Sequence, residues 1–237
     1  MTENRRGISE DMDSVQSAGL LTEKQKEVHD IPFCGCLSVR YYQPYFDVDT
    51  SDVTSRISSS LLYCRSETNF LMATREKPDA YGPFWISTTL VFMLAVASHL
   101  NGWLSSWMKG GAWVYDFQSV LTASSLVYGF ALFTPIAIWF VFKQFDTTLQ
   151  FVSVVCLYGY SLTIFIPAVM LCLVPSELVC WLSLFTAALT STVFLLRSLA
   201  PIIVQQARKQ TAAMLGAVGC VQLAFVLCLK FYFFYEK

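Results

Sequence analysis

The sequence predicts an all-α membrane protein with five transmembrane helices and a largely disordered cytosolic N-terminal tail. The first observation is composition: of 237 residues, 55% are hydrophobic and 14% are charged, and the mean hydropathy of +0.51 is too high for an ordinary soluble domain. The second is charge: residues 1–81 carry nine of the 16 Lys and Arg and 13 of the 17 Asp and Glu. The third is a series of five apolar runs after this segment. A net charge of -1 without a clustered basic face argues against nucleic acid as a partner.

The tail, residues 1–81, has two parts. Met1 to Ile31 is rich in Ser, Glu, Asp and Lys, so it cannot bury enough apolar surface to fold, and it lacks the apolar stretch of a secretory signal. Near residues 50–62, Val53, Ile57 and Leu61 recur at four-residue spacing after a polar capping segment, which predicts a short amphipathic helix. Such a helix lies either on the membrane surface or against the tail's own aromatic residues, and both alternatives stay open.

Residues 82–237 contain the five apolar runs and form the predicted membrane domain. Each run is close to the ~20 residues that cross ~30 Å of hydrocarbon. The runs are roughly Phe84–Leu100, Val120–Phe142, Phe151–Val174, Leu178–Leu196 and Ala212–Leu229. Only Pro175, Ser176 and Glu177 separate the third run from the fourth, which favours a tight antiparallel hairpin over one long kinked helix.

The basic residues near the ends of the runs predict the orientation. Loops rich in Lys and Arg stay on the cytosolic side. The residues assigned to that side are Arg75, Lys77, Lys143, Arg197, Arg208 and Lys209. We therefore expect a cytosolic N-terminus and a luminal C-terminus. The aromatic residues expected in the first luminal loop, at the headgroup layer, are Trp103, Trp107, Trp113 and Tyr115.

The runs offer no visible chemistry for catalysis. Charged residues deep in a membrane span usually mark transport or catalysis. Here the charged residues near the runs, Asp116, Asp146, Glu177 and Lys230, lie outside them or at their edges. We therefore predict that the protein is not an enzyme. The position of the charged residues outside the runs or at their edges also argues against an ion-coupled transporter. A channel or carrier for a neutral solute or lipid remains the alternative function.

The eight cysteines do not form a disulfide pattern, because those in apolar runs behave as small hydrophobic residues. The nearest approach to a metal site is His29 with Cys34 and Cys36, which lacks a fourth ligand. We predict no metal and no cofactor. The tail cysteines are interpreted as free or S-acylated thiols.

Small and weakly polar residues recur within the runs, where they allow helices to approach closely. They include Ser124, Ser125, Gly129, Gly159, Ser161, Thr186, Ala187, Thr190, Ser191, Thr192, Ala212, Gly216 and Gly219. Packing within the bundle and packing against a partner membrane protein both explain them.

Three stretches resemble the Yip family of small multispanning Golgi and endoplasmic-reticulum proteins, in its branch with the first and second human members. The stretches are Tyr41–Thr50 (YYQPYFDVDT), Pro78–Trp85 (PDAYGPFW) and Leu157–Leu162 (LYGYSL). The resemblance implies a Golgi-membrane adaptor in vesicle-mediated transport that associates with membrane lipids, prenylated Rab GTPases and Yif-type or other Yip-family relatives. It also implies a set of partner-binding residues within these stretches. They are Asp47, Asp49, Asp79, Tyr81, Gly82, Pro83, Tyr158, Gly159 and Tyr160.

The segment from Asp79 to Pro83 has two interpretations. As a helix start, Pro83 suits the first turn and Asp79 complements the positive helix N-terminus. As a recognition site, the Asp79 carboxylate contacts a basic partner or tethers the tail near Arg75 and Lys77.

Overall fold

The structure is a computed structural model that describes residues 43–61, 70–75, 77–110, 117–144, 150–174, 176–206 and 211–234. The chain divides into two units, Met1–Pro44 and Tyr45–Lys237, and the architecture below is that of the second. The predicted disordered segment from Met1 to Ile31, and the group of His29, Cys34 and Cys36, lie outside the described residues.

Every regular element in the described ranges is a helix. In chain order they are η2 (Gln43–Tyr45), α3 (Thr50–Leu61), α4 (Phe70–Arg75), α5 (Tyr81–Lys109), α6 (Gln118–Lys143), α7 (Phe151–Ser161), η3 (Leu162–Ile164), α8 (Phe165–Leu171), α9 (Glu177–Gln206) and α10 (Thr211–Phe233). Five segments are long and apolar enough to cross a membrane: α5, α6, α7 with η3 and α8, α9, and α10. The predicted all-α fold with five spans is confirmed.

Two of the helices extend well beyond their apolar runs. Helix α5 continues to Lys109 and ends at Gly110, whose φ of 68° is the left-handed conformation common after a helix. Trp103 and Trp107 therefore lie on α5, with rings stacked at 6.3 Å, and not in a loop as predicted. Likewise Arg197 lies within α9 instead of flanking its end. Hydropathy marks only the hydrocarbon-buried part of a helix, whereas the backbone hydrogen bonds continue through the interface.

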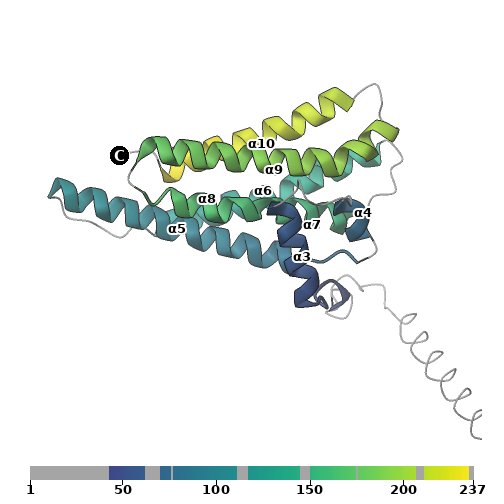
Figure 1. The fold of residues 1–237 in the computed structure, drawn as a ribbon, viewed down its shortest axis with the longest axis horizontal. Helices are drawn as coiled ribbons and strands as arrows, with labels where there is room; N and C mark the ends of the chain where they lie inside the picture. The colour runs from purple at the N-terminus through teal and green to yellow at the C-terminus, as the bar shows by residue number, and fades with distance from the viewer. Residues whose placement is uncertain are drawn as a thin grey trace, which may run out of the picture. The chain divides into compact units, whose positions relative to one another are not determined.

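The third span is the centre of the bundle (Figure 1). Its α7 part packs against α5, α6 and α9, and its α8 part packs against α5 and α9. In the most apolar 18-residue stretch of this span 67% of the residues are buried, against 28% in α6 and in α10. The remaining spans thus expose more of their apolar surface to lipid.

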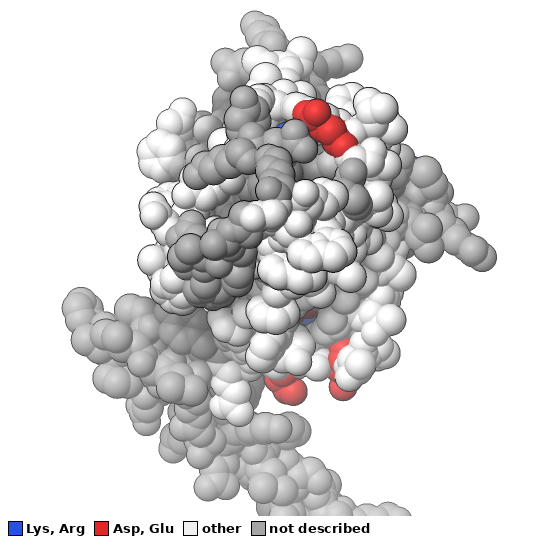
Figure 2. All heavy atoms as spheres, turned by 90° about the vertical axis from the view of Figure 1, so that its left-hand side faces the viewer, with Lys and Arg blue, Asp and Glu red and all other residues white. Residues whose placement is uncertain are grey.

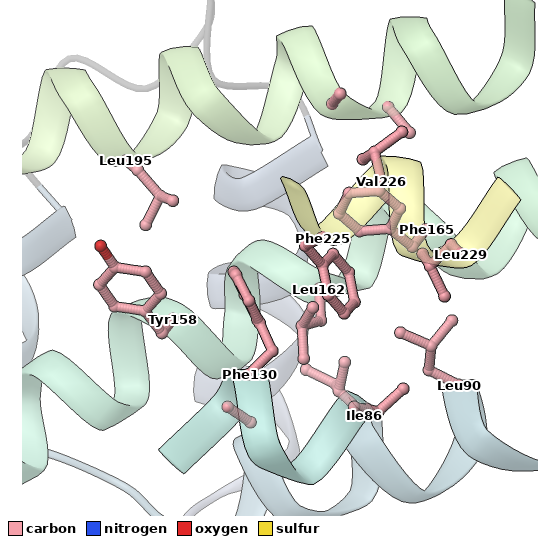
Figure 3. Packing of buried hydrophobic residues seen from close by; sticks show 14 of the residues in the cluster. Ile86, Leu90, Phe130, Tyr158, Leu162, Phe165, Leu195, Phe225, Val226 and Leu229 are labelled. Carbon is pink, nitrogen blue, oxygen red and sulfur yellow. The ribbon is translucent and has the colours of Figure 1, made fainter. Parts of the chain in front are cut away.

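The core between the helices contains a cluster of aromatic rings among aliphatic side chains (Figure 3). Phe130 of α6 stacks on Phe225 of α10 with ring centroids 4.2 Å apart, and Phe165 of α8 meets the same ring edge-on at 5.4 Å. Close packing of this kind holds transmembrane helices together, because lipid tails are as apolar as the helix surfaces.

The third span is not one continuous α-helix. The 3-10 turn η3 interrupts it three residues before Pro167, which has no N–H to donate to the carbonyl of Thr163. Near this break the Ser161 carbonyl accepts a hydrogen bond from Ser191 Oγ at 3.0 Å, and Ser191 Oγ accepts one from Gln222 Nε2 at 2.8 Å. This polar chain joins three spans, so here two of the small polar residues serve packing within the bundle.

The third and fourth spans form a hairpin. Helices α8 and α9 pack against each other, and Cys172 Sγ lies 3.8 Å from the Cys180 carbonyl oxygen. The alternative of one long kinked helix is therefore wrong. Asn101 Nδ2 of α5 donates to the Cys172 carbonyl at 3.4 Å, which places the hairpin beside the C-terminal part of α5. In Figure 2, which faces this end, most of the described surface is uncharged, a few acidic groups are visible, and almost no basic group is.

Candidate functional site

The Asp79 carboxylate is the centre of a buried polar cluster just before α5. Its side chain is 0% exposed and forms an ion pair with Arg56 of α3 through Oδ2. The Tyr160 hydroxyl donates to the same oxygen at 3.0 Å, and Cys156 Sγ donates to Oδ1 at 3.6 Å. The second guanidinium nitrogen of Arg56 donates to the Lys77 carbonyl at 2.7 Å. We name as the Asp79 corner the set Arg56, Asp79, Gly82, Pro83, Cys156, Gly159 and Tyr160.

The charge of Arg56 is retained although its side chain is only 14% exposed. Burial is the largest single influence and works against the charged guanidinium, but the attraction of Asp79 together with the contributions of Cys156 and Tyr160 outweighs it, and the pKa of Arg56 is raised above its ordinary value. Two buried charges that satisfy each other are costly to separate, because the remaining partner is left unpaired away from water.

Two glycines in the corner allow α5 and α7 to interlock. A Cβ on Gly82 would collide with the Tyr160 hydroxyl and lie 2.9 Å from Cε2 of its ring. A Cβ on Gly159 would lie 2.6 Å from Cα of Pro83. Gly82 thus leaves room for Tyr160, which is next to Gly159, and Gly159 leaves room for Pro83, which is next to Gly82. A larger residue at either position would force the two helices apart.

The corner lies well inside the third span. Tyr160 is nine residues after the first residue of α7, about 14 Å along the helix axis. Helix α5 thus begins beside the middle of the third span. The short helix α4 packs on the N-terminal helix of that span and on α9. Its Phe70 ring lies 5.6 Å from that of Tyr160 and 5.1 Å from that of Phe194.

Helix α3 lies where the sequence predicts an amphipathic helix, but its environment differs from both alternatives. It packs on α7, η3 and α9, so the bundle itself covers its apolar side. The backbone N–H of Ala80 donates to the Tyr45 carbonyl at 2.9 Å, which attaches the start of this segment to the start of α5. A fixed helix of the tail is therefore part of the membrane domain.

Asp79 directly precedes the first turn of α5 but does not cap it, and its predicted favourable interaction with the positive helix N-terminus stays a prediction. The N-cap residue of α5 is Ala80, and no side-chain hydrogen bond caps this end. The tethering interpretation identified the right carboxylate, but its ion-pair partner is Arg56, and Lys77 contributes only its carbonyl. The side chain of Arg75 lies outside the described residues.

The structure separates the nine predicted site residues into two groups. Asp79, Gly82, Pro83, Gly159 and Tyr160 come together in the corner, where all are buried. Tyr158 is also buried, against Phe130 at 6.0 Å, but its hydroxyl has no hydrogen-bond partner among the described residues (Figure 3). The other three, Asp47, Asp49 and Tyr81, are exposed. Only these three can contact a partner directly in the fold described.

Two residues of the corner, Arg56 and Cys156, were not predicted. Arg56 is three residues after Val53 and next to Ile57, so it lies on the apolar side of its own helix. A charge at such a position indicates a buried partner. Cys156 precedes Tyr160 by four residues, which places both side chains on one face of α7.

Comparisons with known proteins identify the family of the chain. The model of the Yip1 domain matches residues 61–229. The chain is 33% identical over 213 residues to the Protein YIPF1 homolog of Dictyostelium discoideum, covering 90% of this chain and 58% of that protein. It is 26% identical over 196 residues to Protein YIP5 of Schizosaccharomyces pombe, covering 80% of this chain and 78% of the relative. No solved structure matches significantly. With five spans and a matched domain that covers most of them, this chain belongs to the Yip1 domain family of membrane proteins.

Proposed function

We propose that this protein is a non-enzymatic adaptor in vesicle-mediated transport in the Golgi and endoplasmic-reticulum region, where it binds prenylated Rab GTPases and Yif-type relatives. The observation that carries the proposal is the Asp79 corner. Its carboxylate is 0% exposed and bonded to Arg56, Tyr160 and Cys156, so it holds the tail helix α3 on the bundle and is not presented to a substrate. A tail segment that is fixed in this way gives a partner a defined surface to bind.

The proposed docking surface is the exposed part of the same segment. Tyr81 is 41% exposed, and its ring lies 6.1 Å from that of Trp85, which is 51% exposed. The exposed carboxylates of Asp47 and Asp49 precede α3. Aromatic side chains beside acidic groups suit a partner that carries basic residues and a lipid tail.

The orientation belongs to the proposal. The tail packs on the bundle from the cytosolic side, where Rab GTPases act, and the α8–α9 hairpin lies on the luminal side. Support comes from the positions of the basic residues in the sequence and from the scarcity of basic groups on the described surface in Figure 2.

Co-purification with a panel of Rab GTPases tests the adaptor role. At least one Rab should be recovered with the full chain, and recovery should fall to background when its prenylation cysteines are replaced. Equal recovery of the unlipidated Rab would overturn the lipid-dependent interaction. The variant Tyr81→Ala should reduce recovery several-fold at normal abundance.

Trp107→Ala is the matched control for Tyr81→Ala. It removes an aromatic side chain that is 72% exposed near the other end of α5, and it should leave recovery unchanged. Equal losses for the two variants would show that general hydrophobic adhesion, and not this surface, accounts for the binding.

A further inference from the structure

Two buried thiols meet at the α8–α9 hairpin. Cys172 directly follows α8 and Cys180 lies in the first turn of α9, and their sulfur atoms are 2.7 Å apart. The Ser183 hydroxyl lies 3.3 Å from Cys172 Sγ. A disulfide bond has an S–S distance of about 2.05 Å, so the two sulfurs need to approach by only about 0.7 Å to bond.

The pair lies at the far end of the third span. Cys172 is 21 residues after Phe151, the first residue of this span, which is about 30 Å along the helices. This length equals the hydrocarbon thickness of a bilayer, about 30 Å. With the connection between α6 and α7 on the cytosolic side, beside Lys143, the pair therefore faces the lumen, where disulfides form and persist.

We propose that Cys172 and Cys180 form an intramolecular disulfide that closes the α8–α9 hairpin. The inference rests on the proposed orientation and adds a covalent bond to it. The oxidant is a disulfide-bearing oxidoreductase or small-molecule disulfide of the lumen. One cysteine thiolate attacks a sulfur of the oxidant, giving a mixed disulfide and one free thiol. The second thiolate then attacks the bound cysteine sulfur and expels the other sulfur of the oxidant. The oxidant gains two electrons, and its two thiols take up both protons.

The last span covers the pair once the bundle is complete. Lys230 of α10 donates to the Phe234 carbonyl at 3.1 Å, and its ammonium lies 5.3 Å from the Trp181 ring centroid. Cys172 and Cys180 are then 3% and 4% exposed. Because α8 and α9 precede α10 in the chain, the exchange takes place before α10 packs, and the finished fold shields the bond from reduction.

Cleavage at a single glutamate tests the proposal. Between Glu76 and Glu236 the chain has only one glutamate, Glu177, which lies between the two cysteines. The full-length protein is purified from membranes with thiols blocked, denatured, and digested with a glutamate-specific protease. The fragments 77–177 and 178–236 should migrate as one species without reductant and as two species after reduction.

Three variants identify the bond. Cys172→Ser and Cys180→Ser should each give separate fragments without reductant. Cys220→Ser, an exposed cysteine of α10, should leave the fragments joined. Separate fragments from the unreduced wild-type protein would overturn the disulfide. A glycosylation acceptor at each terminus reports the orientation independently: joined fragments with a modified N-terminus would keep the disulfide and overturn the orientation.

Discussion

The variant Asp79→Asn gives the sharpest test of the corner. It keeps the shape of the side chain and removes its charge, so the guanidinium of Arg56 remains beside a neutral amide. Loss of one partner from a buried ion pair costs about 3–5 kcal/mol. Because the Arg56 side chain keeps 14% exposure, water relieves part of this cost, and we expect about 3 kcal/mol.

Thermal unfolding of the detergent-solubilised protein measures this change. For a chain of this size 1 kcal/mol corresponds to about 2–4 °C in Tm, so Asp79→Asn should lower Tm by about 6–12 °C. Cys156 provides a local readout because its thiol donates to Asp79 and is buried. Its labelling by a water-soluble maleimide should be faster in the variant. Asp47→Asn, which changes an exposed carboxylate, should stay within about 0.5 kcal/mol of wild type.

A double-mutant cycle separates the ion pair from other effects. Arg56→Gln alone should destabilise by a similar amount, since it leaves the Asp79 carboxylate unpaired at 0% exposure. The double variant Asp79→Asn with Arg56→Gln should cost less than the sum of the two single changes, because neither residue then carries a buried charge. Strictly additive losses in stability would refute the ion pair as the element that holds α3 on the bundle. A Tm for Asp79→Asn within about 2 °C of wild type, with Cys156 still protected from labelling, would refute it as well.

Three further predictions concern the interlock, the core and the orientation. Gly159→Ala places a Cβ against Pro83 and should destabilise by about 1–3 kcal/mol in thermal unfolding, whereas Gly216→Ala, with open space around it, should be neutral or stabilising; equal effects would contradict the interlock. Gln222→Leu removes the hydrogen bond to Ser191 and should lower the free energy of unfolding by only about 0.6 kcal/mol, the average for a hydrogen bond between membrane helices. A loss of stability several times larger would contradict this and show that the polar chain fixes the bundle. A glycosylation acceptor fused after the last residue should be modified in cells while one within the first ten residues is not, and the opposite result would reverse the orientation.

Local patterns were sufficient to predict the five spans and the helix α3, but not the short helix α4 or the break within the third span. Five apolar runs of membrane-crossing length predicted five spans, because a helix satisfies its own backbone hydrogen bonds and so can cross lipid alone. The recurrence of Val53, Ile57 and Leu61 predicted a helix in the place where α3 lies. The short connection of Pro175, Ser176 and Glu177 favoured the hairpin over one long kinked helix, since a proline beside a charge is unfavourable inside a membrane helix. These properties depend on composition and spacing over a few turns.

The tertiary structure decided which residues face each other. The sequence marked Asp79 and Gly159 as unusual, but it did not show that Arg56, 23 residues earlier, neutralises that carboxylate, or that Pro83 occupies the space beside that glycine. It also placed Cys172 and Cys180 among the unpaired cysteines, whereas the hairpin brings their sulfurs to 2.7 Å. Contacts between helices depend on how far each helix extends past its apolar run and on how it is rotated in the bundle. Hydropathy carries no information on the extension or the rotation of a helix, because lipid and protein interior are equally apolar surroundings for a side chain.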